Sequence, residues 1–358
     1  DSRPEEETSA AAPESSAPQS AASSTSATTE ETTETSAAEH EGPRATAEGH
    51  VVVLSTGGTI ASTHDKTGAV VPTVTGSKLV EPLSGTFDKD KLTLEVKDIA
   101  KLDSSAMTLD DTDTIIEAVD KELQRDDVDG VVVTHGTDSM EETAIAVDTF
   151  QDSDKPVALT GAMRPFDDPD PDGPDNLALA VKTVTDPSNK GRGTFIAFAD
   201  HVIPARGAFK SDTTKADGFA NNNGKKQPQR QKALKFKPLG NTRVDIIAAY
   251  PGAPADLIQR SLDSGAEGIV IEGMGAGNIG DELAQAAKAA AKKVPVVLTT
   301  RVDHGPVEGI YGGAGGGATL ADAGVISSGT LRAPQARMLL AAAITTGTDA
   351  EDLFAHAE

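Results

Sequence analysis

The chain has 358 residues, a formal net charge of −24, an aromatic content of 3% and no cysteine. The acidic excess argues against nucleic acid as a partner, because phosphate backbones are bound by clustered lysine and arginine. No apolar run approaches the roughly 18 residues that a membrane-spanning helix needs, and the lack of cysteine excludes disulfides, thiolate catalysis and cysteine-ligated zinc.

Residues 1–48 consist almost entirely of Ser, Thr, Ala, Glu and Pro, without a periodic apolar face. Such a segment cannot bury enough apolar surface to offset its ordering entropy, which predicts a disordered leader. A leader of this composition is typical of the spacer in a secreted or surface-anchored protein. The alternative is a solubilising tail on a cytosolic protein.

From residue 49 the pattern changes, and short apolar runs bounded by Gly and Asp alternate with helical stretches. This alternation predicts an α/β domain over 49–220, built on an open, doubly wound, mostly parallel sheet. The expected elements in chain order are strands at 51–54, 92–97, 130–133, 156–159 and 194–198, with helices near 110–125, from Glu141 and from Asp175.

Residues 221–241 break this rhythm, being rich first in Asn and then in Lys and Gln, and are predicted to link two domains. The alternation resumes over 242–358, which predicts a second, smaller α/β domain. Its expected elements are strands at 244–249, 268–271 and 294–298 and helices at 254–264, 281–293 and 334–345.

The first candidate site is Thr56-Gly57-Gly58-Thr59-Ile60, directly after the first strand. In an open α/β sheet, ligands bind at the carboxyl ends of the strands. Two glycines allow a tight turn with backbone N–H groups close to a ligand, and Thr59 lies where a nucleophilic hydroxyl is needed. From these five residues alone, an ordinary glycine-rich turn is an equally good interpretation.

A second threonine-bearing turn, Thr134-His135-Gly136-Thr137-Asp138, joins another apolar strand to a helix. The start of a helix favours anionic groups. In a second interpretation, which is compatible with the first, Thr137 or Asp138 is the helix N-cap and Glu141 completes a capping box with Asp138. Two such turns on neighbouring strand ends favour a functional site.

At these two segments the sequence resembles the bacterial L-asparaginase and glutaminase-asparaginase family, and the resemblance extends over residues 50–345. Further shared motifs are Gly-Ala-Met-Arg-Pro at 161–165, Gly-Pro-Asp-Asn-Leu at 173–177 and Ser-Gly-Thr-Leu at 328–331, followed by Gln335-Ala336-Arg337. The resemblance implies two α/β domains, the larger one flavodoxin-like. It also implies a homotetramer of paired dimers, with active sites between one subunit's large domain and its partner's small domain.

The activity implied by the resemblance is that of an exported enzyme that hydrolyses L-asparagine to L-aspartate and ammonia, with side activity on glutamine. Thr59 would be the primary nucleophile and would form an acyl-enzyme, which divides one difficult step into two easier ones. Thr137, Asp138 and Lys210 would form the second catalytic group. The chemistry requires no metal and no organic cofactor.

Substrate binding is expected from Ser104 and Ser105, which match the positions that hold the substrate's α-carboxylate and α-amine in the family. The family usually has Gln at the place of Ser105, which weakens that assignment. Thr137 and Asp138 would also contact the substrate. Glu308 would supply an acidic group across the dimer interface.

The loop after the first motif departs from the family, which usually carries there a tyrosine that polarises the nucleophile. Counted without gaps, that place falls on Pro72. Tyr311, three residues after Glu308, is a candidate source of the missing phenol. The loss leaves an alternative function open, that of an exported amino-acid-binding protein on an inactive asparaginase-like scaffold.

Two further patterns favour other functions. Residues 275–280 form a G-x-G-x-x-G between a strand and a helix, as in dinucleotide sites, but little chain follows for a substrate domain. Residues 168–173 imitate the start of an EF-hand loop, but Leu179 stands at the place of the bidentate Glu. Both remain minor alternatives, and we expect no metal site.

Overall fold

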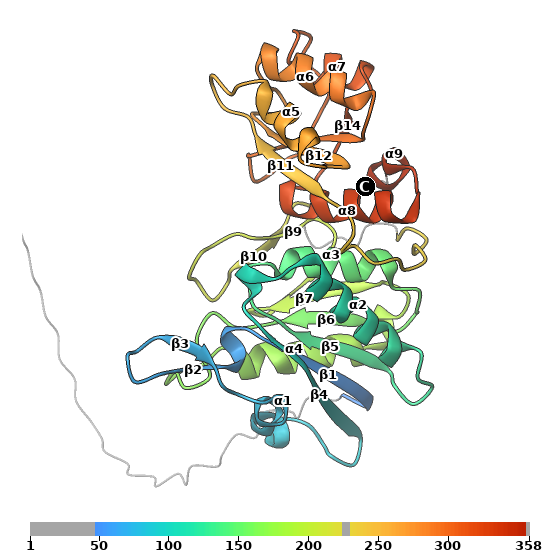
Figure 1. Ribbon diagram of the computed structural model, residues 1–358. Coiled ribbons are helices and arrows are strands. Elements are labelled where there is room, and N and C mark those ends of the chain that lie inside the picture. Colours follow the sequence, from blue (N-terminus) through green and yellow to red (C-terminus); the bar gives the residue numbers. More distant parts are fainter. Residues whose placement is uncertain (1–46, 224–229, 356–358) are drawn as a thin grey trace, which may run out of the picture. The chain divides into compact units, whose positions relative to one another are not determined.

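The structure is a computed structural model and describes residues 47–223 and 230–355, which belong to one compact unit, Pro43–Glu358 (Figure 1). Most of the predicted leader therefore lies outside the described residues. Of its last two residues, Ala47 is buried in the core and Glu48 is exposed.

The larger sheet has six strands in the order β4-β1-β5-β6-β7-β8. All neighbours are parallel except β8, which is antiparallel to β7. Taken in chain order, the five parallel strands follow the sequence 2-1-3-4-5 of flavodoxin-like sheets, so the predicted fold class is confirmed. The strands are β1 (Gly49–Gly57), β4 (Leu92–Leu102), β5 (Gly130–Thr134), β6 (Val157–Thr160), β7 (Thr194–Phe198) and β8 (His201–Pro204).

Helices cover both faces of this sheet, which explains why its strands are apolar without alternation. In β1, Val52 and Leu54 pack with the α2 and α3 side, whereas Val51 and Val53 pack with the α1 and α4 side. The helices are α1 (Gly76–Val80), α2 (Leu109–Leu123), α3 (Met140–Phe150) and α4 (Gly173–Thr185), with short 3-10 segments η1 (Thr59–Ala61), η2 (Glu81–Gly85), η3 (Ser104–Ala106) and η4 (Pro187–Asn189).

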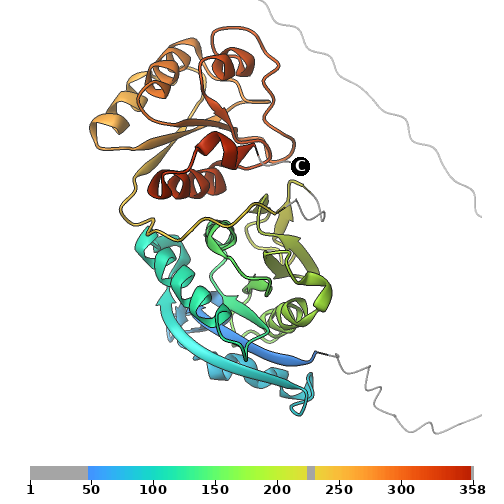
Figure 2. The ribbon, with the colours of Figure 1, turned by 90° about the vertical axis from the view of Figure 1, so that its right-hand side faces the viewer.

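The second sheet has four parallel strands in the order β11-β12-β13-β14. Helices α5 and α6 pack on one face, and α8 packs on the other face and against α3 of the first sheet (Figures 1 and 2). The elements are β11 (Val244–Ala248), α5 (Asp256–Asp263), β12 (Gly268–Gly273), α6 (Asp281–Ala291), β13 (Val296–Thr300), α7 (Gly317–Asp322), β14 (Ile326–Ser327), α8 (Ala333–Thr346) and α9 (Ala350–Phe354).

Two small hairpins were not predicted. One pairs β2 (Ser62–His64) with β3 (Val70–Pro72), and the other pairs β9 (Ala208–Lys210) with β10 (Phe219–Asn221). Each strand has three residues, too few for a periodic pattern to identify it in the sequence.

Within the predicted linker, 221–241, contacts with helices α2 and α3 are made by Leu234, Phe236 and Leu239. Residues 224–229 lie outside the described residues. Leu239 has no exposed surface, and the backbone N–H groups of Leu239 and Gly240 donate to the Asp113 carboxylate of α2 at 2.8 and 2.9 Å. This part of the connection is therefore part of the core. The predicted domain boundaries stay a prediction.

None of the helices that the structure describes combines the length and apolar composition that crossing a bilayer requires.

Candidate active site

The two threonine-bearing turns lie side by side at the carboxyl ends of β1 and β5. The strands are paired, and the Thr56 hydroxyl donates to the Thr134 carbonyl at 2.7 Å. Gly58 has a φ of 84°, and a Cβ there would lie 2.5 Å from the Gly136 nitrogen. Only glycine fits such a close approach with positive φ, so the Gly-Gly pair lets the turns meet.

Thr59 begins η1, directly after this contact. The Gly58 carbonyl accepts from the Ala61 N–H at 3.1 Å and from the Ser62 hydroxyl at 2.7 Å, which holds the turn in place. Thr59 is half-buried, and its hydroxyl makes no hydrogen bond to any residue that the structure describes. The hydroxyl is therefore not committed to a structural contact.

Lys210 reaches the second turn from β9. Its Nζ donates to the Thr137 hydroxyl at 2.9 Å and lies 3.3 Å from Asp138 Oδ1. The Lys210 side chain is 20% exposed and that of Asp138 is 58% exposed. The structure thus brings together three of the four predicted catalytic residues, although Lys210 is 73 residues from Thr137 in the sequence.

Ser104 joins the same group, whereas Ser105 is turned to a local contact. Ser104 is buried in η3, accepts from the Asp138 N–H at 3.2 Å through its hydroxyl, and accepts from the Ser139 hydroxyl at 2.6 Å through its carbonyl. The Ser105 N–H and hydroxyl both donate to Asp103, at 2.9 and 2.6 Å. Asp103 is therefore the N-cap of η3, and the Ser105 hydroxyl is committed to this local contact.

The predicted capping box at the start of α3 is wrong. The N-cap is Ser139, and it makes no side-chain capping bond. Glu141 instead accepts the Lys210 N–H at 3.3 Å, because β9 packs over the first turn of α3. Burial and, to a lesser degree, the neighbouring Glu142 raise the pKa of Glu141 to about 7. The capping-box pattern singled out Glu141, but the hydrogen-bond donor to its carboxylate is the Lys210 N–H of the distant strand β9.

His135 is a second residue whose role the sequence did not reveal. It has no exposed surface, and its ring lies 2.6 Å from the Gly136 carbonyl and 2.8 Å from the Thr143 hydroxyl. Burial lowers its pKa to about 4, so the ring is neutral at neutral pH. His135 therefore supports the turn that carries Thr137.

Glu308 lies in the connection between β13 and α7, where it is exposed and its N–H donates to the Ala276 carbonyl at 3.0 Å. Tyr311 is 54% exposed in the same connection. Pro72 lies in the β2–β3 hairpin opposite Ser62. Within the described part of a single chain, no hydrogen bond, ion pair or ring contact joins Glu308 or Tyr311 to Thr59 or Lys210.

Comparison with known proteins identifies the family. Residues 50–237 match the model of the N-terminal asparaginase domain, and residues 243–355 match that of the glutaminase/asparaginase C-terminal domain. The chain belongs to the asparaginase family.

Relatives in this family align over most of their length. L-asparaginase 2 of Escherichia coli is 34% identical over 339 residues, which cover 86% of this chain and 92% of that protein. L-asparaginase 2 of Bacillus subtilis is 32% identical over 327 residues, covering 86% and 85%. The crystal structure of a probable cytoplasmic L-asparaginase from Campylobacter jejuni is 29% identical, with a TM-score of 0.76, and covers 87% of this chain and all of that one.

The two rival motifs have structural roles in this asparaginase-family chain. Gly277, in the G-x-G-x-x-G, has a φ of 112°, and a Cβ there would lie 2.6 Å from Val307. In the acidic loop, Asp172 accepts the N–H groups of Met163 and Arg164, both at 2.9 Å, so its carboxylate points into the fold. No cluster of three or more His, Cys, Asp or Glu suited to a metal ion occurs among the residues that the structure describes.

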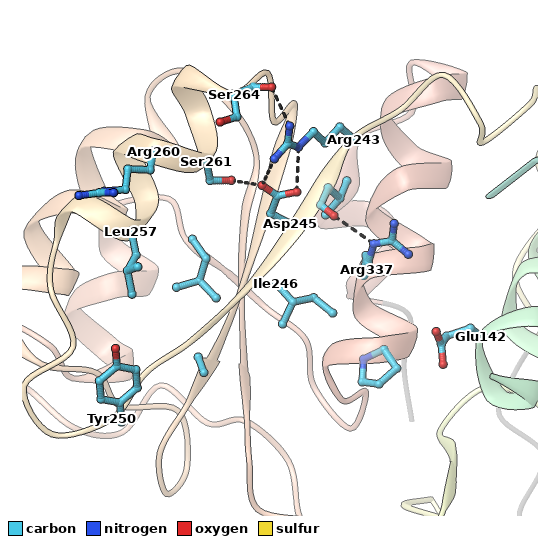
Figure 3. A pocket seen from close by; sticks show the side chains of 14 residues that line it. Glu142, Arg243, Asp245, Ile246, Tyr250, Leu257, Arg260, Ser261, Ser264 and Arg337 are labelled. Atoms are coloured by element: carbon cyan, nitrogen blue, oxygen red, sulfur yellow. Dashed lines mark hydrogen bonds and ion pairs between the residues drawn. The ribbon is translucent and has the colours of Figure 1, made fainter. Parts of the chain in front are cut away.

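A cavity of about 800 Å³ lies elsewhere, along the free edge of β11 and beside α5 and α8 (Figure 3). Arg243 pairs with Asp245 at 3.0 and 3.1 Å, and the Ser261 hydroxyl donates to the same carboxylate at 2.5 Å. Ile246 and Tyr250 are each 44% exposed in it. None of the predicted site residues lines this cavity, so it is separate from the proposed active site.

Proposed function

We propose that this chain hydrolyses L-asparagine to L-aspartate and ammonia through a threonine nucleophile. The observation that carries the proposal is the contact of Lys210 Nζ with Thr137 at 2.9 Å and with Asp138 at 3.3 Å, beside the turn that begins at Thr59. A lysine ordered between a hydroxyl and a carboxylate is the arrangement that activates a weak oxygen nucleophile.

In the proposed first step, the Thr59 oxygen attacks the side-chain amide carbon of asparagine. The new C–O bond forms, the C–N bond breaks, and the proton given up by the Thr59 hydroxyl leaves with the nitrogen as ammonia. Water then attacks the β-aspartyl ester, releases L-aspartate and restores the hydroxyl. The backbone N–H groups at the glycine-rich strand ends are suited to stabilise the oxyanion of both steps.

Lys210 is proposed to act as the base, receiving the proton of the nucleophile through the Thr137 hydroxyl. Asp138 would hold the amine in position, and Ser104 would orient Asp138 through its backbone N–H. We propose that Ser104, Thr137 and Asp138 also bind the substrate's α-carboxylate and α-amine. Ser105 is a weaker candidate for this role, since its hydroxyl is bonded to Asp103.

The alternative function, amino-acid binding without turnover, would give this group of residues no purpose. A binding protein needs charge and hydrogen-bond complementarity to its ligand but no lysine aligned on a hydroxyl. Ammonia release from asparagine by the purified protein separates the two functions, because a binding protein releases none.

The nucleophile is tested by Thr59→Ala, with Thr63→Ala as the matched control. Thr63 lies in the neighbouring hairpin, and its hydroxyl lies 2.7 Å from that of Thr73. We expect Thr59→Ala to lower kcat at least about a thousandfold, because the attacking oxygen is removed, and Thr63→Ala to change it by less than about threefold. Activity within about tenfold of the parent, or about 1.4 kcal/mol of barrier, would assign the attack to another group.

We further propose that the chain forms a homotetramer in which Glu308 completes the partner's site. The exposure of Ile310 (61%) and Tyr311 (54%) beside Glu308 supports an interface there, since large apolar side chains are rarely exposed together. Export to the cell exterior or surface is also a proposal, supported by the Ser-, Thr- and Pro-rich composition of residues 1–48.

A further inference from the structure

A buried glutamine of the second sheet's helix α8 is bonded to both segments that carry the proposed catalytic group. Gln335 is 1% exposed. Its side-chain oxygen accepts the Gly207 N–H at 2.8 Å, and its side-chain nitrogen donates to the carbonyls of Ala205 at 2.7 Å and Glu141 at 3.0 Å. All three partners are backbone groups.

These partners lie close in sequence to the reacting groups. Ala205 and Gly207 immediately precede β9, which carries Lys210, and Glu141 is in the first turn of α3, three residues after Asp138. Gln335 therefore ties the start of β9 to the start of α3. A second link runs directly between the two elements, from the Lys210 N–H to the Glu141 carboxylate at 3.3 Å.

The geometry of the strand start makes this link important. Gly207 has a φ of 91°, so the chain turns sharply there before entering β9. Strand β9 and the turn before it are also held by the pairing with β10, by the Asn221 side chain, which donates to the carbonyls of Pro204 and Arg206 at 2.9 Å, and by the packing of Phe209 against His304. A turn of this kind has several accessible arrangements unless its backbone groups are bonded to a rigid element. Helix α8, buried between the second sheet and α3, is such an element.

We infer that Gln335 is a positioning residue that sets the distance from Lys210 to Thr137 and Asp138. It touches no reacting atom and acts through the backbone of β9 and α3. The inference rests on the proposed role of Lys210. Because a displacement of about 1 Å in a catalytic group can lower the rate about a hundredfold, loss of this link should affect turnover more than binding.

The test is Gln335→Met, which keeps the side-chain length but removes both hydrogen-bonding groups, with Gln151→Met as the matched control. Gln151 is 3% exposed, lies at the other end of α3, and donates to the Lys155 carbonyl at 2.7 Å. Both changes remove a buried side-chain amide near α3, Gln335 in α8 beside the start of α3 and Gln151 as the C-cap residue of α3. The full-length chain is used, and kcat, KM and melting temperature are measured for each variant.

We expect Gln335→Met to lower kcat about 10- to 100-fold with KM changed less than about threefold, and Gln151→Met to leave kcat within about threefold. Equal losses of kcat in the two variants would overturn the inference, since any lost buried amide would then suffice. If Gln335→Met does not fold, the kcat of Gln335→Glu is measured instead. This variant keeps an acceptor for Gly207 but cannot donate twice, so unchanged kcat in Gln335→Glu also overturns the inference.

A double variant separates this inference from the role of Lys210 itself. If Gln335 acts through Lys210, adding Gln335→Met to Lys210→Met should lower residual activity less than about threefold further. A further loss of kcat as large as that of Gln335→Met alone would show that Gln335 acts by another route. Full activity in Lys210→Met would instead contradict the proposed function of the lysine, whatever Gln335→Met does.

Discussion

At the scale of single residues, the proposed chemistry depends on how Lys210 is held. The amine has two oxygen partners, at 2.9 Å on Thr137 and 3.3 Å on Asp138, and these come from one turn while the lysine comes from another strand. The Lys210 side chain is 20% exposed, so water competes little for the amine. Such an arrangement favours proton transfer to Lys210 through the Thr137 hydroxyl.

Replacement of Lys210 should therefore lower turnover without weakening substrate binding. We expect Lys210→Met to reduce kcat by at least about a hundredfold with KM changed less than about threefold, because a base acts in the transition state. Lys210→Arg should fail as well, since a guanidinium does not give up its proton at working pH. Steady-state kinetics with asparagine provide the measurement, and full activity of Lys210→Arg would exclude lysine as the base.

His135 should make the free energy of unfolding depend on pH. Its folded pKa of about 4 lies below the ordinary value of 6.5, so the unfolded chain binds the extra proton first as the pH falls. The contribution of neutral His135 to the free energy of unfolding is thus fully present above about pH 6.5. It is lost as the pH falls towards 4, by up to about 3 kcal/mol.

The measurement compares urea unfolding of the parent and of His135→Gln from pH 7.5 to 4. The parent should lose its advantage over the variant as the pH falls. Subtracting the two curves removes the contribution of Glu141 and Glu142. Their raised pKa values, about 7, have the opposite sign and reduce stability as the pH rises. A constant difference between the curves would mean that folding does not change the pKa of His135.

At the scale of elements, the connection between the two sheets is packed where the sequence indicated a linker. Polar composition over 221–241 suggested a solvated segment, but Leu239 is fully buried and its N–H is bonded to Asp113. Desolvation raises the pKa of Asp113, and the two backbone N–H donors oppose this shift. The connection therefore contributes to stability.

Leu239→Ala should lower the free energy of unfolding by about 2–5 kcal/mol, the usual range for a fully buried leucine, because it leaves a cavity beside α2. The exposed Lys237 of the same segment provides the control, and Lys237→Ala should stay within about 0.5 kcal/mol. Chemical denaturation of both variants is the measurement. A cost below about 1 kcal/mol for Leu239→Ala would restore the interpretation as a loose linker.

At the scale of the whole molecule, helix α8 joins the two sheets. It packs on β12 and on α3, and Gln335 extends this contact to the start of β9. The proposed catalytic group therefore depends on both sheets of one chain. If Glu308 also reaches the site of a neighbouring subunit, each site would depend on two chains.

Mixing two inactive variants tests that dependence. Thr59→Ala and Glu308→Ala are expected to be inactive alone, whereas hybrid dimers would contain one intact site each, because a two-fold axis exchanges the contributions of the subunits. Refolding an equal mixture should restore activity to about a quarter of the parent level if subunits pair at random. No recovery in hybrids verified by mass spectrometry would place Glu308 in its own chain's site or in none.

Most of the fold and part of the site followed from local patterns. The buried strands are recognisable because both faces of the first sheet are covered, so runs such as Val51–Leu54 are continuously apolar. The two threonine turns could be found because the polar residues directly after a buried parallel strand lie at the ligand-binding edge of the sheet. Glycine at position 58 is required by the turn itself.

Long-range pairing decided the rest. Strands β9 and β10 have three residues each, so their existence depends on their pairing with each other and on the core beneath them. The bond from Glu141 to Lys210 replaced a local capping box, and Gln335 was visible as a motif residue but not as a link between β9 and α3. Such contacts join residues 69 to 194 positions apart, and no local period encodes them. They form only when hydrophobic burial has brought the two sheets together. A buried amide without a hydrogen-bond partner then costs free energy, so these groups pair with one another.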